Sequence, residues 1–90
     1  MPLTVFKYSW PGSGDRAQFD MMPGAEVIHV DNQREQICLW VRGNPSSESV
    51  ERRTFVLCGT GHPAPGGPHV GTVLLQGGRY VFHIFEEVSK

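Results

Sequence analysis

The sequence predicts a small all-β domain, and three observations carry this prediction. Glycine (11) and proline (7) are frequent in the 90-residue chain, which favours short strands joined by turns over a helix bundle. Apolar residues alternate with a period of two in several short segments, and no segment holds the apolar spacing of an amphipathic helix. The length fits a single domain over residues 1–90. We expect an antiparallel β-sandwich or a partly open barrel of about six to seven strands, which periodicity does not separate.

The first four predicted strands span residues 3–10, 16–21, 26–31 and 36–42. Turn-forming residues separate them, at positions 11–15, 22–25 and 32–35. In the fourth strand, an apolar face of alternating residues lies opposite a face that holds Cys38 and Trp40. Both faces are apolar, so we expect this strand to be central, with Trp40 in the core beside the loops.

Three more strands are predicted over residues 52–58, 70–75 and 80–86. A polar loop over residues 43–49 precedes the first of them, and a loop rich in glycine and proline precedes the second. The last two strands form a predicted hairpin, because Gly77 and Gly78 readily adopt the positive φ angles that a two-residue turn requires.

Charge and hydropathy exclude several classes of protein. The formal net charge is −1, with 8 Lys and Arg against 9 Asp and Glu, which argues against non-specific binding to nucleic acid. The apolar stretches are far shorter than the roughly 20 residues that cross a bilayer, so we expect no membrane association. A chain of this size buries only about 60% of its unfolded surface, so we also consider that it forms a homo-oligomer.

Cysteines and histidines are too scattered to predict an enzyme or a metal site. Cys38 and Cys58 lie in apolar strand-like runs with no signal peptide before them, which favours reduced thiols and a cytoplasmic protein. Cys58, His62 and His69 offer thiolate and imidazole ligands but lack the two close ligand pairs of a typical zinc site. We therefore predict no metal, no cofactor and no catalytic residue.

The loop from residue 59 to residue 69 is the strongest candidate for a binding site. Core packing does not explain its four glycines and three prolines. Backbone N–H groups, a hydroxyl and an imidazole are suited to hold an anion, and they come from Gly59, Thr60, Gly61 and His62, with His69 at the far end of the loop. Arg52, Arg53 and Trp40 are candidate neighbours of this cradle, in part across an oligomer interface.

Several strings of the sequence resemble a family of short, uncharacterised bacteriophage and prophage proteins. They include Met22-Pro23-Gly24-Ala25, Gly59-Thr60-Gly61-His62-Pro63 and Val81-Phe82-His83-Ile84-Phe85-Glu86. The resemblance spans nearly the whole chain. It implies a phage origin and a cytoplasmic site of action in the infected bacterium, and it carries no activity with it.

Two functions from different classes follow. In the first, the protein is a phage accessory protein that binds a host or phage protein, for instance to inhibit a host defence component, through an aromatic patch and its loops. In the second, it captures a small phosphorylated ligand or a nucleotide in the loop of residues 59–69. We expect the first, because it needs less special geometry.

Overall fold

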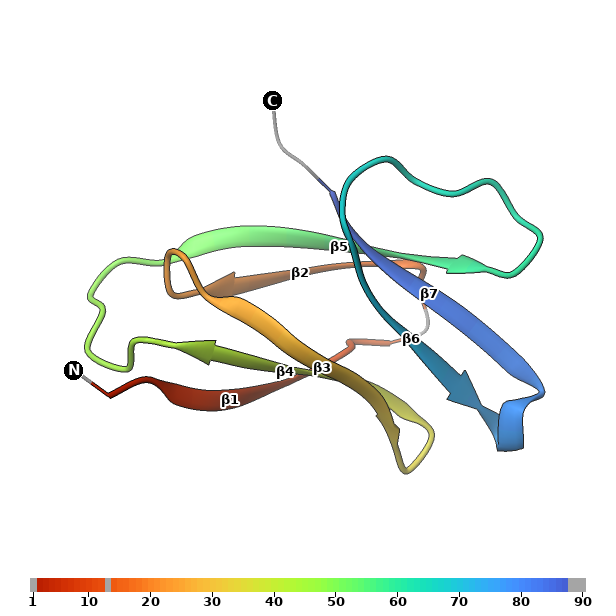
Figure 1. Cartoon of the computed structure of the whole chain (residues 1–90), viewed down its shortest axis with the longest axis horizontal. Helices are drawn as coiled ribbons and strands as arrows, with labels where there is room; N and C mark the ends of the chain where they lie inside the picture. Colours follow the sequence, from red (N-terminus) through yellow and green to blue (C-terminus); the bar gives the residue numbers. More distant parts are fainter. Residues whose placement is uncertain (1, 13, 88–90) are drawn as a thin grey trace.

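The computed structural model describes residues 2–12 and 14–87 as two antiparallel sheets (Figure 1). One sheet has three strands in the order β1-β4-β3, and the other has four in the order β2-β5-β7-β6. The bounds are β1 Thr4–Ser9, β2 Arg16–Met21, β3 Glu26–Gln33, β4 Gln36–Gly43, β5 Glu51–Gly59, β6 His69–Leu75 and β7 Tyr80–Glu87, with a single 3-10 turn, η1, at Gln76–Gly78. The prediction of an all-β fold of about six to seven strands is confirmed, and of the two architectures left open the structure shows a sandwich.

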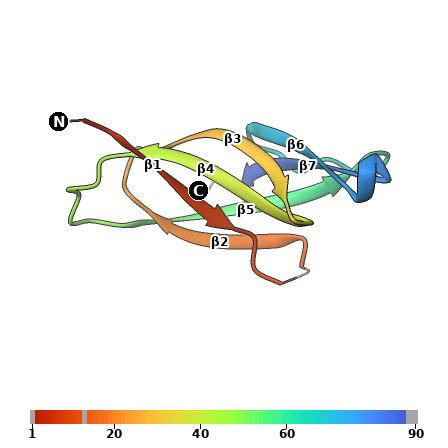
Figure 2. The same cartoon turned by 90° about the horizontal axis from the view of Figure 1, so that it is seen from below.

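The chain changes sheets after β1, β2 and β4. Only β3–β4 and β6–β7 are hairpins of consecutive strands, whereas β1 pairs with β4 and β2 pairs with β5. Figure 2 shows the two sheets lying one over the other, with β3 and β6 on the same side of the sandwich. Within the described residues there is no helix long and apolar enough to cross a membrane.

The core lies between the two sheets. Leu39 and Val41 of β4, Phe55 of β5 and Ile84 of β7 are fully buried, because strand alternation turns them all toward the opposite sheet. Aromatic rings extend this core toward β2, where the ring centroid of Phe19 lies 6.0 Å from that of Phe55. The central position predicted for the strand at residues 36–42 is confirmed, since β4 pairs with strands on both sides.

Trp40 does not lie in the core, and the prediction that placed it there is wrong. Alternation along β4 points its side chain away from the other sheet, on the face opposite Leu39 and Val41. The indole is half-buried and packs against His29 of β3, with 5.4 Å between the ring centroids. Trp40 is therefore a surface residue of the three-stranded sheet.

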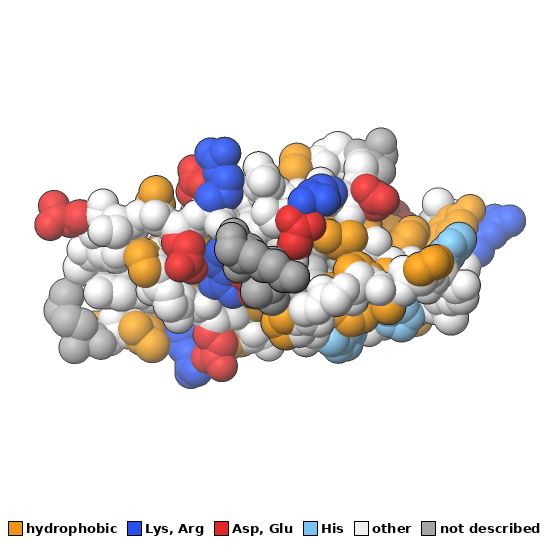
Figure 3. Space-filling model, turned by 90° about the horizontal axis from the view of Figure 1, so that it is seen from above, with side chains coloured by type: hydrophobic (Ala, Val, Ile, Leu, Met, Phe, Trp, Pro, Cys, Tyr) orange, Lys and Arg blue, Asp and Glu red, His pale blue; other side chains and the backbone are white. Residues whose placement is uncertain are grey.

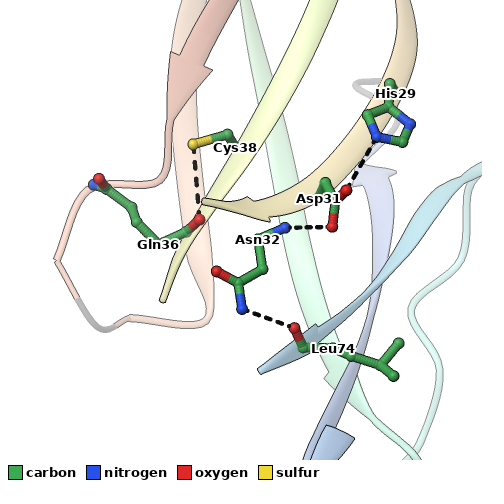
Figure 4. Close-up of polar contacts among 6 residues, drawn as sticks. All are labelled: His29, Asp31, Asn32, Gln36, Cys38 and Leu74. Atoms are coloured by element: carbon green, nitrogen blue, oxygen red, sulfur yellow. Dashed lines mark hydrogen bonds and ion pairs between the residues drawn. The ribbon is translucent and has the colours of Figure 1, made fainter. Parts of the chain in front are cut away.

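A close contact and a polar link hold β3 against β6. A Cβ at Gly71 would lie 2.6 Å from Val30 Cγ2, so only glycine fits there. At the end of β3, Asn32 Nδ2 donates to the carbonyl oxygen of Leu74 at 3.1 Å (Figure 4). Next to it, the N–H of Gln76 donates to Glu35 Oε1 at 2.8 Å. These contacts close one side of the sandwich.

Two turns differ from the prediction. Residues 32–35 were expected as a polar connection, but β3 and β4 extend until Gln33 pairs with Gln36, leaving Arg34 and Glu35 with φ of 54° and 63° as a two-residue turn. The β6–β7 connection has the predicted bounds, since Leu75 pairs with Tyr80, and Gly77 and Gly78 have the expected positive φ of 68° and 92°, but it forms η1 instead of a two-residue turn. Ser13, in the turn predicted at residues 11–15, lies outside the described residues.

Candidate functional site

The end of the four-stranded sheet that carries the β5–β6 loop and the β6–β7 turn projects beyond the β3–β4 turn (Figure 2). Its inner face therefore lacks complete cover from the other sheet. Tyr80 is 47% exposed there, and its ring stacks on Phe82 at 6.4 Å between centroids and 18° between planes. Leu57 and Leu75 lie half-buried on the same face. We call these four residues the ledge.

The predicted cradle is a tight turn at the edge of the ledge. The N–H of His62 donates to the Gly59 carbonyl oxygen at 3.1 Å, and Gly61 has a φ of 92°, the combination found in type II turns with glycine at the third position. The His62 ring lies over Gly59, where a Cβ would be 3.1 Å from His62 Cδ2. The structure thus brings Gly59, Thr60, Gly61 and His62 together.

Cys58 anchors this loop to β5. Its Sγ is directed at the carbonyl oxygens of Gly59, His62 and Pro63, at 3.4, 3.5 and 3.3 Å. The side chain is buried, as expected of a cysteine that packs as a small apolar residue. Several weak S–H contacts to backbone oxygens hold the start of the loop close to the sheet.

A hollow of about 380 Å³ lies between the turn and β7. We call it the Arg79 hollow; its lining residues are Gly59, Thr60, His62, Arg79, Tyr80, Val81 and Phe82. Arg79 was not predicted as a site residue. It follows η1, and the β5–β7 register, which pairs Gly59 with Phe82, brings it close to the loop. Among the described residues, its guanidinium has no ion-pair partner.

Two further hollows adjoin this one, and Phe82 lines all three. One is a cleft of about 270 Å³ between the sheets, where Trp10 and Ile37 face Leu57 and Leu75. The other, of about 520 Å³, is bounded by Asp15 and by loop residues that include Pro63 and Pro65. The ledge is therefore the floor of a concave region at this end of the molecule.

His69 lies on the opposite, outer face of the sheet, in a network of hydrogen bonds. His69 Nε2 and His83 Nδ1 both lie 3.1 Å from Thr72 Oγ1. His83 Nε2 is in turn 2.9 Å from Thr60 Oγ1. The structure thus joins His69 to Thr60, as the sequence suggested, but through Thr72 and His83, and it places His69 and His62 on different surfaces.

These residues belong to an uncharged area that we call the outer patch. Strand register places Phe85 between Val56 and His69, His83 beside Thr72, and Val81 beside Leu74. The outer patch therefore comprises Val56, His69, Thr72, Leu74, Val81, His83 and Phe85. Figure 3 shows hydrophobic and histidine side chains gathered toward the end of the molecule that carries the β5–β6 loop and the β6–β7 turn, whereas acidic and basic side chains alternate elsewhere on that face.

Arg52, Arg53 and Trp40 do not join the cradle within one chain. Arg52 and Arg53 lie at the start of β5, seven and six residues from Gly59, which is about 20–23 Å along a strand. Arg52 pairs with Asp20 at 3.2 Å, and Arg53 with Glu86, whose carboxylate raises the pKa of Arg53 above its ordinary value. Trp40 lies on the other sheet.

The cysteines and histidines of the described residues do not form a metal-binding cluster. Cys38 and Cys58 are both free thiols, and they lie in different sheets. Among residues 2–12 and 14–87, no three side chains of His, Cys, Asp or Glu gather closely enough to hold a metal ion. The chemistry of this end of the molecule is therefore that of hydrogen bonding, aromatic contact and one free guanidinium.

Comparison with known proteins gives one match. A family model described as a domain of unknown function (DUF7352) matches residues 1–90. No curated protein and no solved structure matches the chain. Arguments about function therefore rest on the geometry of the site.

Proposed function

Because the chain belongs to DUF7352, a family of domains of unknown function, we propose its function from its surface: it is a binding protein that presents the outer patch to another protein. The proposal includes a phage-encoded accessory protein whose partner is a host or phage protein, for instance a defence component that it inhibits. This part draws on the resemblance of its sequence strings to short phage proteins.

The observation that supports the proposal is the absence of charge from the outer patch. The outer face of a sheet in a two-layer sandwich is normally polar, yet Leu74 is 53% exposed and Val56, Val81 and Phe85 are half-buried on this face. Centres of protein interfaces are depleted in charged residues and enriched in aromatic ones. The outer patch has no Asp, Glu, Lys or Arg, and Phe85 supplies an aromatic side chain to it.

The polar groups of the outer patch are held in place before any partner arrives. Thr72 joins the rings of His69 and His83, and the His69 ring also packs edge-on against Phe85 at 5.3 Å between centroids. Side chains that are already ordered lose less entropy on binding. The network therefore favours a recognition role for these histidines.

The experiment compares two variants that add the same charge at equal exposure. Leu74→Lys places a lysine in the outer patch, and Val5→Lys places one on β1 of the other sheet, where Val5 is 51% exposed. Tagged wild-type protein and both variants are used to capture partners from an extract of the host cell, and a captured protein is then purified and titrated calorimetrically. We expect Val5→Lys to bind as the wild type does and Leu74→Lys to bind at least tenfold more weakly.

Two results would contradict this proposal. One is a partner that binds Leu74→Lys as tightly as the wild type. The other is a stable homodimer in light scattering that Leu74→Lys dissociates, because a second copy of the chain would then occupy the outer patch.

A further inference from the structure

The Arg79 hollow combines an aromatic surface with a free cation, and we propose that it binds a nucleotide. The base lies against the exposed face of Tyr80, and the phosphate lies among Arg79, His62 and Thr60. This function is distinct from the proposed one, because the hollow opens beside the ledge whereas most of the outer patch lies on the other face of the sheet. The two surfaces meet at Val81, which lines the hollow, and at the hydrogen bond between Thr60 and His83.

The volume of the hollow suits a small ligand. At about 380 Å³ it lies within the range of roughly 300–1,000 Å³ that is typical of small-molecule sites. Its walls come from the turn at residues 59–62 and from β7, which the Gly59–Phe82 pairing holds side by side. Cys58 fixes the turn from beneath through its three carbonyl contacts. The site is therefore preformed.

Tyr80 supplies the surface for a planar base. Its ring lies nearly parallel to that of Phe82, with 6.4 Å between the centroids, and 47% of the residue is exposed, which leaves aromatic surface accessible to a ligand. Bases stack on such rings with little dependence on sequence, because every base has a π face. Phe82 keeps the Tyr80 ring oriented for this contact.

Arg79, His62 and Thr60 supply donors for a phosphate. Arginine binds phosphate oxygens in a two-point geometry, and Arg79 has no carboxylate partner among the described residues. The Thr60 hydroxyl is held by His83 Nε2 at 2.9 Å, and the His62 ring lines the hollow above Gly59. No acidic residue lines this hollow among the described residues.

The two features together point to a nucleotide. A phosphate alone would use the cation and leave the exposed Tyr80 face unoccupied, and a nucleoside alone would leave Arg79 unpaired. A ligand that carries both groups occupies the whole hollow. Each half of the site then adds to the affinity, and the removal of either half weakens binding.

The test is a titration of the ¹⁵N-labelled protein with AMP, GMP, CMP and UMP, followed by NMR. Adenosine, guanosine, cytidine, uridine and inorganic phosphate are titrated separately to distinguish the contributions of base and phosphate. We expect at least one nucleotide to saturate the protein with shifts at Thr60, His62, Arg79 and Tyr80. Its nucleoside and free phosphate should each bind at least tenfold more weakly, because each lacks one set of contacts.

Matched variants test the assignment of residues. Arg79→Gln removes the guanidinium and should weaken nucleotide binding about tenfold or more. Arg34→Gln at the β3–β4 turn should change nothing; like Arg79, Arg34 has no ion-pair partner among the described residues. Tyr80→Leu should weaken the nucleotide but leave phosphate binding as it was. Thermal melting of each variant checks that the fold is retained.

Three results would overturn the inference: no nucleotide binding at millimolar concentration, phosphate binding as tight as that of the nucleotides, or equal loss in Arg79→Gln and Arg34→Gln. Leu74→Lys separates this inference from the proposed function, since it alters the outer patch and should leave nucleotide affinity unchanged. Each proposal can therefore fail without the other.

Discussion

Arg53 and Glu86 form a two-point ion pair that joins β5 to β7 at the edge of the core. Arg53 Nε lies 2.6 Å from Glu86 Oε2, and a terminal guanidinium nitrogen lies 2.8 Å from Oε1. The guanidinium also donates to the carbonyl oxygen of Ala25 and lies 5.8 Å from the centre of the Phe55 ring. With side chains only 14% and 21% exposed, this pair is shielded from water.

We expect Arg53→Ala to destabilise the protein by about 2 kcal/mol, because it leaves the Glu86 carboxylate partly buried without its partner. Urea denaturation measures this as a lower midpoint with an unchanged slope. Arg16→Ala is the control. Arg16 of β2 pairs with Glu87, which follows Glu86 in β7, but both of these side chains are well exposed. Equal losses in the two variants would contradict a structural role for Arg53.

Asp31 should titrate below its ordinary value. The N–H of Asn32 donates to Asp31 Oδ1 at 2.7 Å and His29 Nε2 lies 3.3 Å from Oδ2, and these contacts lower the pKa of Asp31 below 3.8 (Figure 4). The carboxylate therefore stabilises the fold above the unfolded-state pKa, and this contribution is lost as the pH falls through the lower folded-state value.

NMR titration of the Asp31 carboxyl measures this directly. We expect a midpoint below 3.8 in the wild type, and a rise of only part of the difference in His29→Gln, because the larger contribution comes from the Asn32 N–H. A wild-type midpoint at or above 3.8 would show that these contacts do not form in solution.

The close approach of Gly71 to Val30 predicts a pair of coupled substitutions. A Cβ at Gly71 would lie 2.6 Å and 2.8 Å from two Val30 carbons, so Gly71→Ala should cost about 1–3 kcal/mol through overpacking. Val30→Ala alone should also destabilise, since Val30 is buried. The double variant should lose less than the sum, because the smaller residue makes room for the new methyl group. Additive losses in urea denaturation would argue against the contact.

His62 and His69 should separate the two proposed surfaces. His62→Gln should weaken nucleotide binding and leave protein binding intact, whereas His69→Gln should do the reverse, because the two rings lie on different faces of the sheet. Both are exposed, so neither change should lower the melting temperature by more than about 2 °C. If both functions fail together in either variant, the surfaces are not independent.

Strand positions were predictable because they depend on local alternation. The second strand begins and ends at the predicted residues, Arg16 and Met21, and the burial of Leu39, Val41 and Ile84 follows the predicted faces. Trp40 shows the limit of this reasoning. Alternation places it opposite Leu39 correctly, but only the assembled sandwich shows that this face is turned away from the other sheet.

The part of the candidate site that is formed by consecutive loop residues was predictable from the sequence. Gly59 to His62 are consecutive, and the glycine at position 61, which has a positive φ in the structure, indicates a turn. Arg79 and His83 were not predicted as binding residues, because their proximity to the loop depends on the pairing of β5 with β7. The placement of Arg53 depends likewise on Glu86, which follows it by more than thirty residues. Local alternation fixes the face that each side chain occupies, but it does not say which distant strands become neighbours.

The exchange of strands between sheets has a kinetic consequence. The β3–β4 and β6–β7 hairpins close short loops and can form early, but β1 must await β4 and β2 must await β5, with Thr4 paired to Gly43 and Arg16 to Val56. Closing such long loops costs conformational entropy before any strand contacts form, and this slows folding. Refolding should therefore take milliseconds to seconds rather than microseconds, and in that interval the aromatic side chains of the first two strands remain exposed to other chains.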